Sequence, residues 1–162
     1  MSKKDLLSGK KILAVDDEPD VLATIEDLLP MCDVSKASSF DEAKMLLESQ
    51  YFDMAILDIM GVGGYDLLKI ANEKDVIAVM LTAHALSVEN IAKSYEAGAA
   101  SYLPKEKLMD IATFLEDILL AIEKGKDPWW RWLSRLASFW KKEFGPDWQH
   151  NNKEFFQKLK KL

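Results

Sequence analysis

Several residues able to do phosphate or metal chemistry stand directly behind short apolar runs of the sequence. The runs read ILAV, MAIL, VIAVML and SYLP, and the residues that follow them are Asp16, Asp17, Asp58, Thr82 and Lys105. Alone, an aspartate behind a strand most often makes a turn or caps a helix. The ordered series of acid pair, acid, hydroxyl and lysine favours a shared functional site instead.

Three carboxylates placed close together need a partner. Two unit charges about 4 Å apart repel by roughly 4 kcal/mol at an effective dielectric constant of about 20. Either one acid keeps a proton or a cation fills the site, and oxygen ligands without cysteine or histidine favour Mg2+. A carboxylate beside such a cation can attack phosphorus, so Asp58 is the predicted nucleophile and Asp16 and Asp17 the predicted metal ligands.

The other residues of the series suit the same chemistry. The ammonium of Lys105 and the hydroxyl of Thr82 can stabilise the oxygens of a transferring phosphoryl group. The stretch MAILDIMGVGG places three glycines shortly after Asp58. Glycines there keep the approach clear and let the backbone come close to a phosphate.

The elements that must position these residues alternate along the chain. The pattern predicts strands at residues 11–15, 33–37, 54–57, 76–81 and 101–103, and helices at residues 19–30, 39–49, 64–74, 87–98 and 107–125. Continuously apolar strands indicate a sheet that is buried on both faces. Strand and helix alternation indicates parallel strands, whose carboxyl ends meet at one edge. The sequence therefore predicts a doubly wound α/β domain with the acids at a ligand-binding switch point.

Charge is spread unevenly over the 162 residues. Residues 1–126 carry 13 basic and 23 acidic side chains, whereas residues 127–162 carry 8 and 4. The acidic body argues against direct binding of nucleic acid. The single Cys32, the absence of a secretory pattern and the absence of an apolar run of about 18 residues lead us to expect a reduced, cytoplasmic setting.

The segments ILAVDDEPD, MAILDIM, VIAVMLTA and GAASYLPK together resemble the receiver domain of two-component response regulators, over about residues 9–124. The resemblance implies a flavodoxin-like, five-stranded parallel sheet in the order 2-1-3-4-5 with helices on both faces. It divides the chain into a receiver domain at residues 9–125 and a short helical extension at residues 126–162, with no recognisable output domain.

The resemblance also implies a role for each site residue. Asp58 corresponds to the phosphoacceptor, Asp17 to the direct Mg2+ ligand and Asp16 to the acid that holds the metal through water. The Met60 carbonyl corresponds to a backbone ligand, Thr82 and Lys105 to the residues that grip the phosphoryl group, and Tyr102 to an aromatic switch that swings inward as Thr82 moves. The phosphate donor would be a phosphohistidine on a sensor histidine kinase or phosphotransfer protein, and the signal would pass to a downstream protein target.

The sequence departs from the family pattern at two places. Val62 and Asp66 stand where the family usually has proline and glycine, so the loop after the phosphoacceptor is about two residues shorter. Glu106, rather than proline, follows Lys105, and we expect a trans bond there. Met60 and His84 are expected to flank the path of water to the acyl phosphate; Met60 cannot orient water, which predicts slow self-dephosphorylation.

All five tryptophans lie in the extension. An Asp-Pro helix start is followed by apolar residues at helical spacing (Trp129, Trp132, Leu133, Leu136, Trp140 and Phe144), with Arg131, Arg135, Ser138 and Lys142 on the opposite face. Asn151 and Glu154 would cap the start of a second helix, which would carry Phe155, Leu159 and Leu162. Three alternatives stay open for the aromatic face: packing on the receiver or in a homodimer, docking to a partner protein, or attachment to a membrane surface.

Two other functions are compatible with parts of the pattern. A haloacid-dehalogenase-type phosphatase also uses Mg2+, an acid after its first strand, a threonine and a lysine. It would need Asp16 as nucleophile with an aspartate two residues later, but position 18 is Glu18. A receiver-like scaffold that binds a partner without being phosphorylated is the second alternative. Apart from phosphorylating and dephosphorylating itself at Asp58, the chain is not expected to be an enzyme.

Overall fold

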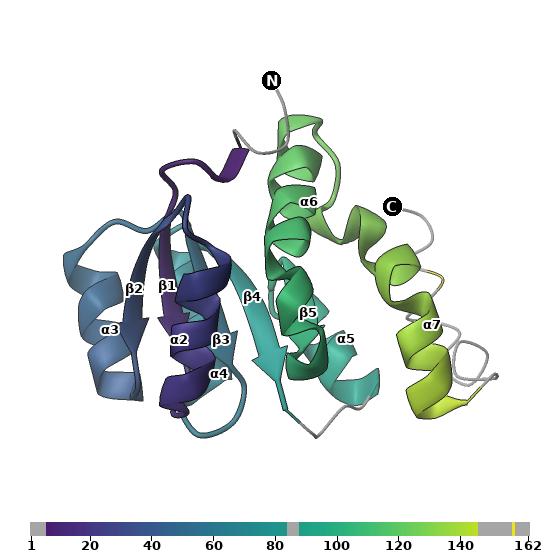
Figure 1. Cartoon of the computed structure of the whole chain (residues 1–162), viewed down its shortest axis with the longest axis horizontal. Helices are drawn as coiled ribbons and strands as arrows, with labels where there is room; N and C mark the ends of the chain where they lie inside the picture. The colour runs from purple at the N-terminus through teal and green to yellow at the C-terminus, as the bar shows by residue number, and fades with distance from the viewer. Residues whose placement is uncertain (1–5, 84–87, 146–156, 158–162) are drawn as a thin grey trace.

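The computed structural model describes residues 6–83, 88–145 and Gln157. Its strands form one parallel sheet in the order β2-β1-β3-β4-β5, the predicted order (Figure 1). The strand bounds are β1 (Lys11–Val15), β2 (Asp33–Ala37), β3 (Met54–Asp58), β4 (Ile77–Thr82) and β5 (Ser101–Pro104). Each lies within one residue of its predicted position at both ends.

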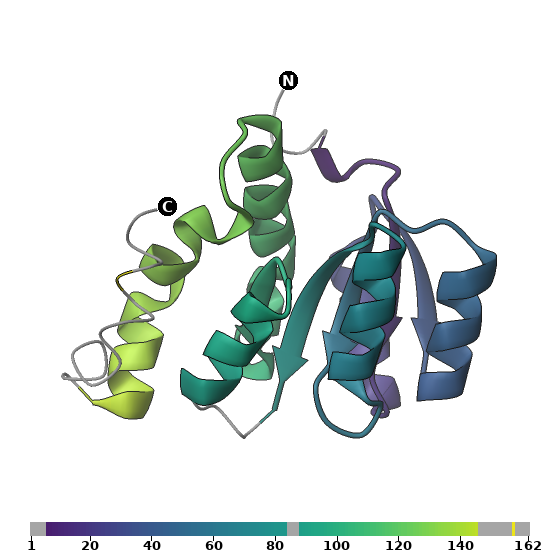
Figure 2. The same ribbon diagram turned by 180° about the vertical axis from the view of Figure 1, so that it is seen from behind.

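Helices cover both faces of this sheet (Figures 1 and 2). Helices α2 and α6 pack on one face, and α3, α4 and α5 on the other. Their bounds are α2 (Pro19–Leu28), α3 (Phe40–Ser49), α4 (Gly64–Glu73), α5 (Val88–Glu96) and α6 (Ile111–Glu123). The fold is the doubly wound α/β architecture that the strand pattern predicted.

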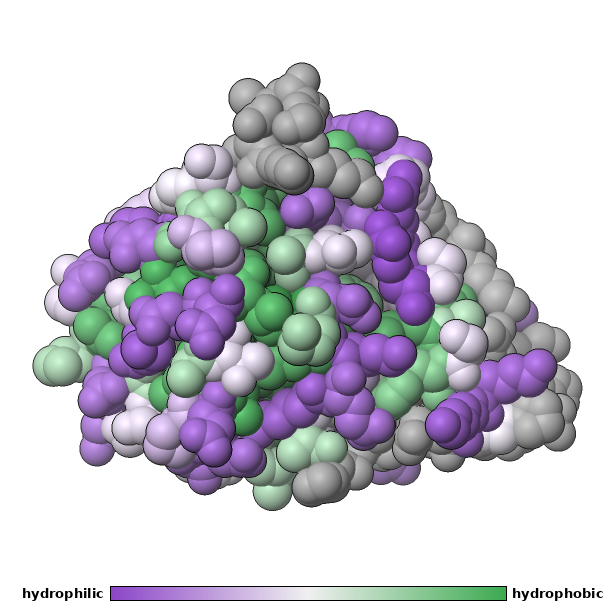
Figure 3. All heavy atoms as spheres, viewed as in Figure 1, coloured by the Kyte–Doolittle hydropathy of each residue, from purple (hydrophilic) through white to green (hydrophobic). Residues whose placement is uncertain are grey.

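Local sequence explains why these elements form where they do. β3 is buried along its whole length, as expected for a central strand covered by helices on both faces. Helix α3 begins at a capping motif, in which the hydroxyl of Ser39 accepts a hydrogen bond from the amide of Glu42. Hydrophilic side chains cover much of the surface of the helices, with apolar residues between them (Figure 3).

The segment after the sheet folds back onto it. A 3-10 turn, η2 (Pro128–Arg131), leads into helix α7 (Trp132–Phe144), and η2 packs against α6. The side chains of Trp129, Trp132 and Leu136 are buried. For these three side chains of the aromatic face, the structure therefore shows packing on the receiver itself, the first of the three alternatives.

Two details differ from the sequence prediction, and other predicted features lie outside the described residues. The helix predicted at residues 107–125 divides into a 3-10 segment, η1 (Lys105–Asp110), and α6, because Lys107 adopts non-helical backbone angles. Arg135, which the helical pattern placed on the solvent face, reaches back to α6. His84, the predicted second helix, and the side chains of Trp140 and Phe144 lie outside the described part of the chain.

The contact of Arg135 fixes α7 to the body. Its guanidinium donates two hydrogen bonds to Asp117 of α6, with Nε 2.7 Å from Oδ2 and a terminal nitrogen 3.1 Å from Oδ1. The side chain of Asp117 is only 8% exposed, whereas that of Arg135 is 34% exposed. A paired, planar geometry of this kind is the favourable form of an ion pair.

We predict that Arg135→Met destabilises the protein by about 1–3 kcal/mol, because it leaves the buried carboxylate of Asp117 without its cation. Urea unfolding measures the change. The matched control is Lys141→Met, which removes an exposed cation from the same helix and should change the stability by less than about 0.5 kcal/mol. Equal effects of the two substitutions would contradict the prediction.

Candidate functional site at the carboxyl edge of the sheet

The carboxyl ends of the strands bring the predicted residues together. Asp16 follows β1, Asp58 and Thr82 are the last residues of β3 and β4, and Lys105 follows β5. The first three side chains are buried, with exposed fractions of 0%, 4% and 3%. Because β3 lies beside both β1 and β4, the residues at these strand ends are neighbours across the sheet.

Lys105 is the cation of this cluster. Its Nζ lies 2.8 Å from Oδ2 of Asp16, 3.2 Å from Oε1 of Glu18 and 3.7 Å from Oδ1 of Asp58. Sequence reasoning had predicted Lys105 and the two aspartates but had not assigned Glu18 to the site. Glu18 directly follows the acid pair, but an exposed acid in that position gives no separate signal in the sequence. One ammonium group therefore faces three carboxylates, which leaves an excess of negative charge.

The excess of negative charge appears in the proton affinities. Burial, and next the charge of Asp16, raise the pKa of Asp58 to about 6, although Lys105 lowers it. Burial also raises the pKa of Asp16, and its contact with Lys105 opposes the shift. Burial alone would lower the pKa of Lys105, but its hydrogen bond and charge interaction with Asp16 raise it. The cluster thus has an electrostatic reason to attract a further cation.

The acids on one side of the cluster fit a hard metal ion. Carboxylate oxygens of Asp16, Asp17 and Glu18 lie within 4.8 Å of one another, and Asp17 and Glu18 face solvent. The position of Gly61 keeps this group open: a Cβ there would lie 2.6 Å from Oδ2 of Asp17. An all-oxygen, partly solvated ligand set of this kind suits Mg2+, which keeps several of its waters.

The glycines after Asp58 have a steric role that the structure makes specific. A Cβ on Gly64 would overlap the backbone carbonyl of Asp58, and Gly63 takes a left-handed conformation with φ of 67° just before α4. The loop can therefore turn tightly beside Asp58. The sequence had suggested an approach to phosphate; the contacts shown are with Asp17 and Asp58 of the chain itself.

Tyr102 and Met60, two further predicted site residues, differ in their exposure to solvent. The side chain of Tyr102 is fully buried, and burial raises its pKa to about 12. Met60 is 67% exposed beside the loop. The Lys105–Glu106 bond is trans, as expected, since the described backbone has no cis peptide bond.

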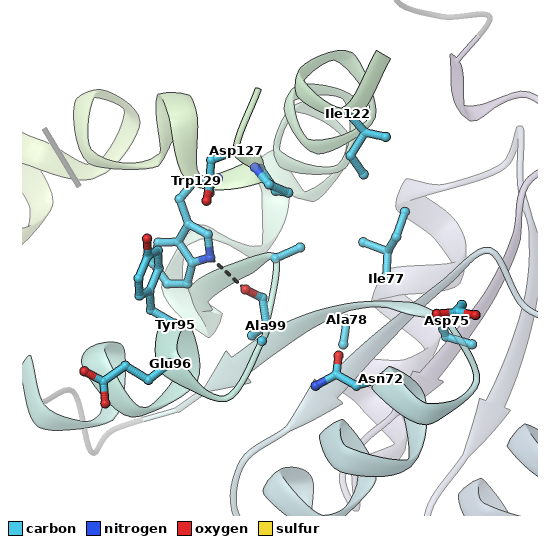
Figure 4. Close-up of a pocket in the computed structure, with 14 residues that line it drawn as sticks. Asn72, Asp75, Ile77, Ala78, Tyr95, Glu96, Ala99, Ile122, Asp127 and Trp129 are labelled. Carbon is cyan, nitrogen blue, oxygen red and sulfur yellow. Dashed lines mark hydrogen bonds between the residues drawn. The ribbon is translucent and has the colours of Figure 1, made fainter. Parts of the chain in front are cut away.

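A separate cavity lies away from the acids, where β4 begins. It has a volume of about 550 Å3 and lies between Asn72, Ile77, Tyr95 and Trp129 (Figure 4). Ile77 is the first residue of β4, whereas Thr82 ends it at the acidic edge. This cavity therefore takes no part in the acid cluster.

A five-stranded doubly wound sheet with buried acids, a hydroxyl and a lysine at its carboxyl edge defines the receiver class of signalling domains. The family model for the response regulator receiver domain matches residues 12–116, and the chain belongs to this family. The family match confirms the resemblance that the sequence motifs indicated.

Individual relatives agree with this assignment. The chain is 36% identical over 103 residues to the two-component response regulator ARR18 of Arabidopsis thaliana, covering 60% of this chain and 16% of that protein. It is 36% identical over 106 residues to the probable transcriptional regulator ycf27 of Guillardia theta, covering 62% and 41%. The chain thus spans well under half the length of these relatives.

A solved structure shows the same fold. The CheY-like receiver domain protein of Methanospirillum hungatei JF-1 superimposes with a TM-score of 0.65 at 29% identity, covering 73% of this chain and 99% of that one. Among the described residues, we find no helix of the length and apolarity needed to cross a bilayer.

We predict that Asp58→Asn raises the free energy of unfolding by about 1–2 kcal/mol at pH 7.5 without Mg2+, because it removes a buried charge that the fold holds unfavourably. The folded protein binds a proton on Asp58 more tightly than the unfolded chain does, with a pKa of about 6 against 3.8. Stability of the unmodified protein should therefore fall as the pH rises from about 4 to 6, and the advantage of the variant should appear over the same interval.

Thermal unfolding in a chelating buffer at several pH values measures this difference. Mg2+ should then stabilise the unmodified protein more than the variant. A variant that is less stable than the unmodified protein at pH 7.5, or a gap that does not change with pH, would contradict the electrostatic account of Asp58.

Proposed function

We propose that this chain is a phosphorylation-dependent response regulator. Asp58 accepts a phosphoryl group from a histidine kinase or phosphotransfer protein, with Mg2+, and the resulting conformational change signals to a protein partner. The observation that carries the proposal is the placement of Lys105 against both Asp16 and Asp58 at the buried edge of the sheet. Family membership supports the same conclusion.

The chain's own residues divide the reaction between them. An oxygen of Asp58 attacks phosphorus and forms a P–O bond, while the bond from phosphorus to the donor's histidine nitrogen breaks and its electron pair stays on the imidazole. Lys105 lies 3.7 Å from Oδ1 of Asp58, where its ammonium can neutralise oxygens of the transferred group. The hydroxyl of Thr82 donates a hydrogen bond to a phosphoryl oxygen.

The acids at this edge of the sheet are suited to hold the metal ion that the proposed reaction requires. Asp16 and Asp17, with Asp58 and the carbonyl of Met60, would hold Mg2+, which when bound neutralises phosphoryl oxygens on the side opposite Lys105. Deprotonated Asp58 is the reactive form. Because burial and Asp16 raise its pKa to about 6, reaction should slow below that pH unless a cation restores the charge balance.

We predict that incubation with a small phosphodonor and Mg2+ puts one phosphoryl group on Asp58, which peptide mass spectrometry can locate. Asp58→Asn should abolish the label, because an amide is not a nucleophile for phosphorus, and a chelator should reduce it strongly. Asp53→Asn is a control that alters an acid just before β3. Labelling of Asp16, with release of phosphate from a generic ester, would instead support the phosphatase alternative, and absence of any label would support the unphosphorylated scaffold.

We also predict a long-lived phosphoprotein, with a lifetime of minutes or more. The exposed thioether of Met60 has no group able to orient an attacking water. Release of phosphate from the purified phosphoprotein measures the lifetime, and Met60→Gln should shorten it by supplying a polar group at the same position. A lifetime of seconds in the unmodified protein would contradict this prediction.

A further inference from the structure

The docked segment, residues 127–139, covers the outer edge of the sheet and donates two indole hydrogen bonds there. The indole N–H of Trp129 donates to the carbonyl of Ala99, and that of Trp132 donates to the carbonyl of Tyr102, each at 2.7 Å. Both indoles are 3% exposed. Because β5 is the last strand of the sheet, Trp132 satisfies a carbonyl group of β5 that a further strand would otherwise bind, whereas Trp129 binds Ala99 just before that strand.

Further contacts hold the segment against three neighbouring elements. The ring of Trp129 packs edge-on against Tyr95 of α5, with centroids 5.3 Å apart. Arg135 binds Asp117 of α6, as described above. The ammonium of Lys107 lies 5.7 Å from the centre of the Phe139 ring, and Lys107 belongs to η1, the segment that begins at Lys105. The docked segment therefore contacts η1, the element that carries the site residue Lys105.

Tyr102 links this docking surface to the phosphoacceptor site. Its carbonyl binds Trp132. The register pairs Tyr102 with Met80, two residues before Thr82, so the side chains of Tyr102 and Thr82 lie on the same face of the sheet. Thr82 in turn ends the strand beside that of Asp58. A single residue thus contacts the docked segment through its main chain, while its side chain shares a sheet face with the site residue Thr82.

We propose that Trp132 is a positioning residue for the site: by holding Tyr102 in its buried position, the docked segment at residues 127–139 raises the affinity of the Asp58 site for a phosphoryl group. The proposal rests on the proposed function and adds its regulation. Reciprocity requires that a phosphoryl group on Asp58 tightens the docking of the segment by the same factor.

The direction of the coupling follows from the geometry. With the segment docked, the side chain of Tyr102 is fully buried and Trp132 holds the main chain of Tyr102 at the edge of β5. Docking therefore favours the buried Tyr102. A phosphoryl group that draws the hydroxyl of Thr82 toward Asp58 favours the same position, because the ring fills the space beside Thr82. Both events select one conformation.

The chain supplies a matched pair of variants for the test. Trp132→Phe and Trp129→Phe each keep an aromatic ring and remove one indole N–H, but only the first removes a bond to Tyr102. The readout is the affinity for beryllofluoride with Mg2+, measured by calorimetry, since beryllofluoride stands in for the phosphoryl group. Trp132→Phe should weaken binding by about three- to tenfold, and Trp129→Phe by less than about twofold.

A double-substitution cycle separates coupling from general destabilisation. In a Thr82→Ala background the link to the site is missing, so the effect of Trp132→Phe on affinity should fall below about twofold. Unchanged affinity in Trp132→Phe, or equal losses in the two tryptophan variants, would overturn the inference while leaving the proposed function intact. Failure of the unmodified protein to bind beryllofluoride would overturn both.

A measurement on the unmodified protein tests the reverse direction. Beryllofluoride with Mg2+ should slow hydrogen exchange of the Trp132 indole N–H by about the same three- to tenfold, which nitrogen-labelled NMR spectra resolve. Unchanged or faster exchange at Trp132 in the saturated protein would contradict the proposal. This arm needs no variant, so it holds even where a substitution prevents folding.

Discussion

The central constraint on this structure is that the single positive charge of Lys105 must offset several carboxylates at one edge of the sheet. One ammonium group faces carboxylates of Asp16, Glu18 and Asp58 at an edge where two of the three are almost fully buried. Removing charged groups from water is unfavourable unless they are paired, and here the pairing is incomplete. The raised pKa of Asp58 reflects this shortage of positive charge. The same shortage favours binding of a cation, which the proposed phosphoryl transfer requires.

The sheet and the loop after Asp58 keep these charged side chains close together. The parallel sheet fixes the strand ends side by side, and at this edge Asp16 and Asp58 are buried, whereas Asp17 and Glu18 face solvent. The loop after Asp58 keeps close to the site because Gly61 and Gly64 have no side chain to collide with Asp17 or with the Asp58 backbone. Larger residues there would push the loop away from the acids and loosen the geometry.

The sequence predicted the sheet and most of the site because both leave strong local signals. Continuous apolar runs mark buried parallel strands, and polar residues at their ends must meet at one edge, so Asp16, Asp58, Thr82 and Lys105 could be grouped without coordinates. The ligand roles proposed for Asp17 and Met60 rest on the family resemblance and stay predictions. Glu18 was missed because an exposed acid beside two others gives no separate signal.

For the extension at residues 126–162, helical periodicity predicted the faces of the helix but not their contacts. Helical spacing identified Trp129, Trp132 and Leu136 as one face, but the pattern could not say what that face would cover. It also placed Arg135 toward solvent, because the long side chain that reaches Asp117 is fixed by a contact between distant segments. The docked arrangement leaves the indoles of Trp129 and Trp132 unavailable to a membrane or partner unless the segment separates from the receiver.

The central claim is that the excess of carboxylates forms a metal-dependent phosphoacceptor pocket around Asp58. Fluorine NMR of the protein with beryllium fluoride tests it most directly, because bound and free fluoride give separate signals. The account predicts bound signals that require Mg2+ and that vanish in Asp58→Asn. Bound signals that persist without Mg2+ or in that variant, or their complete absence from the unmodified protein, would contradict it.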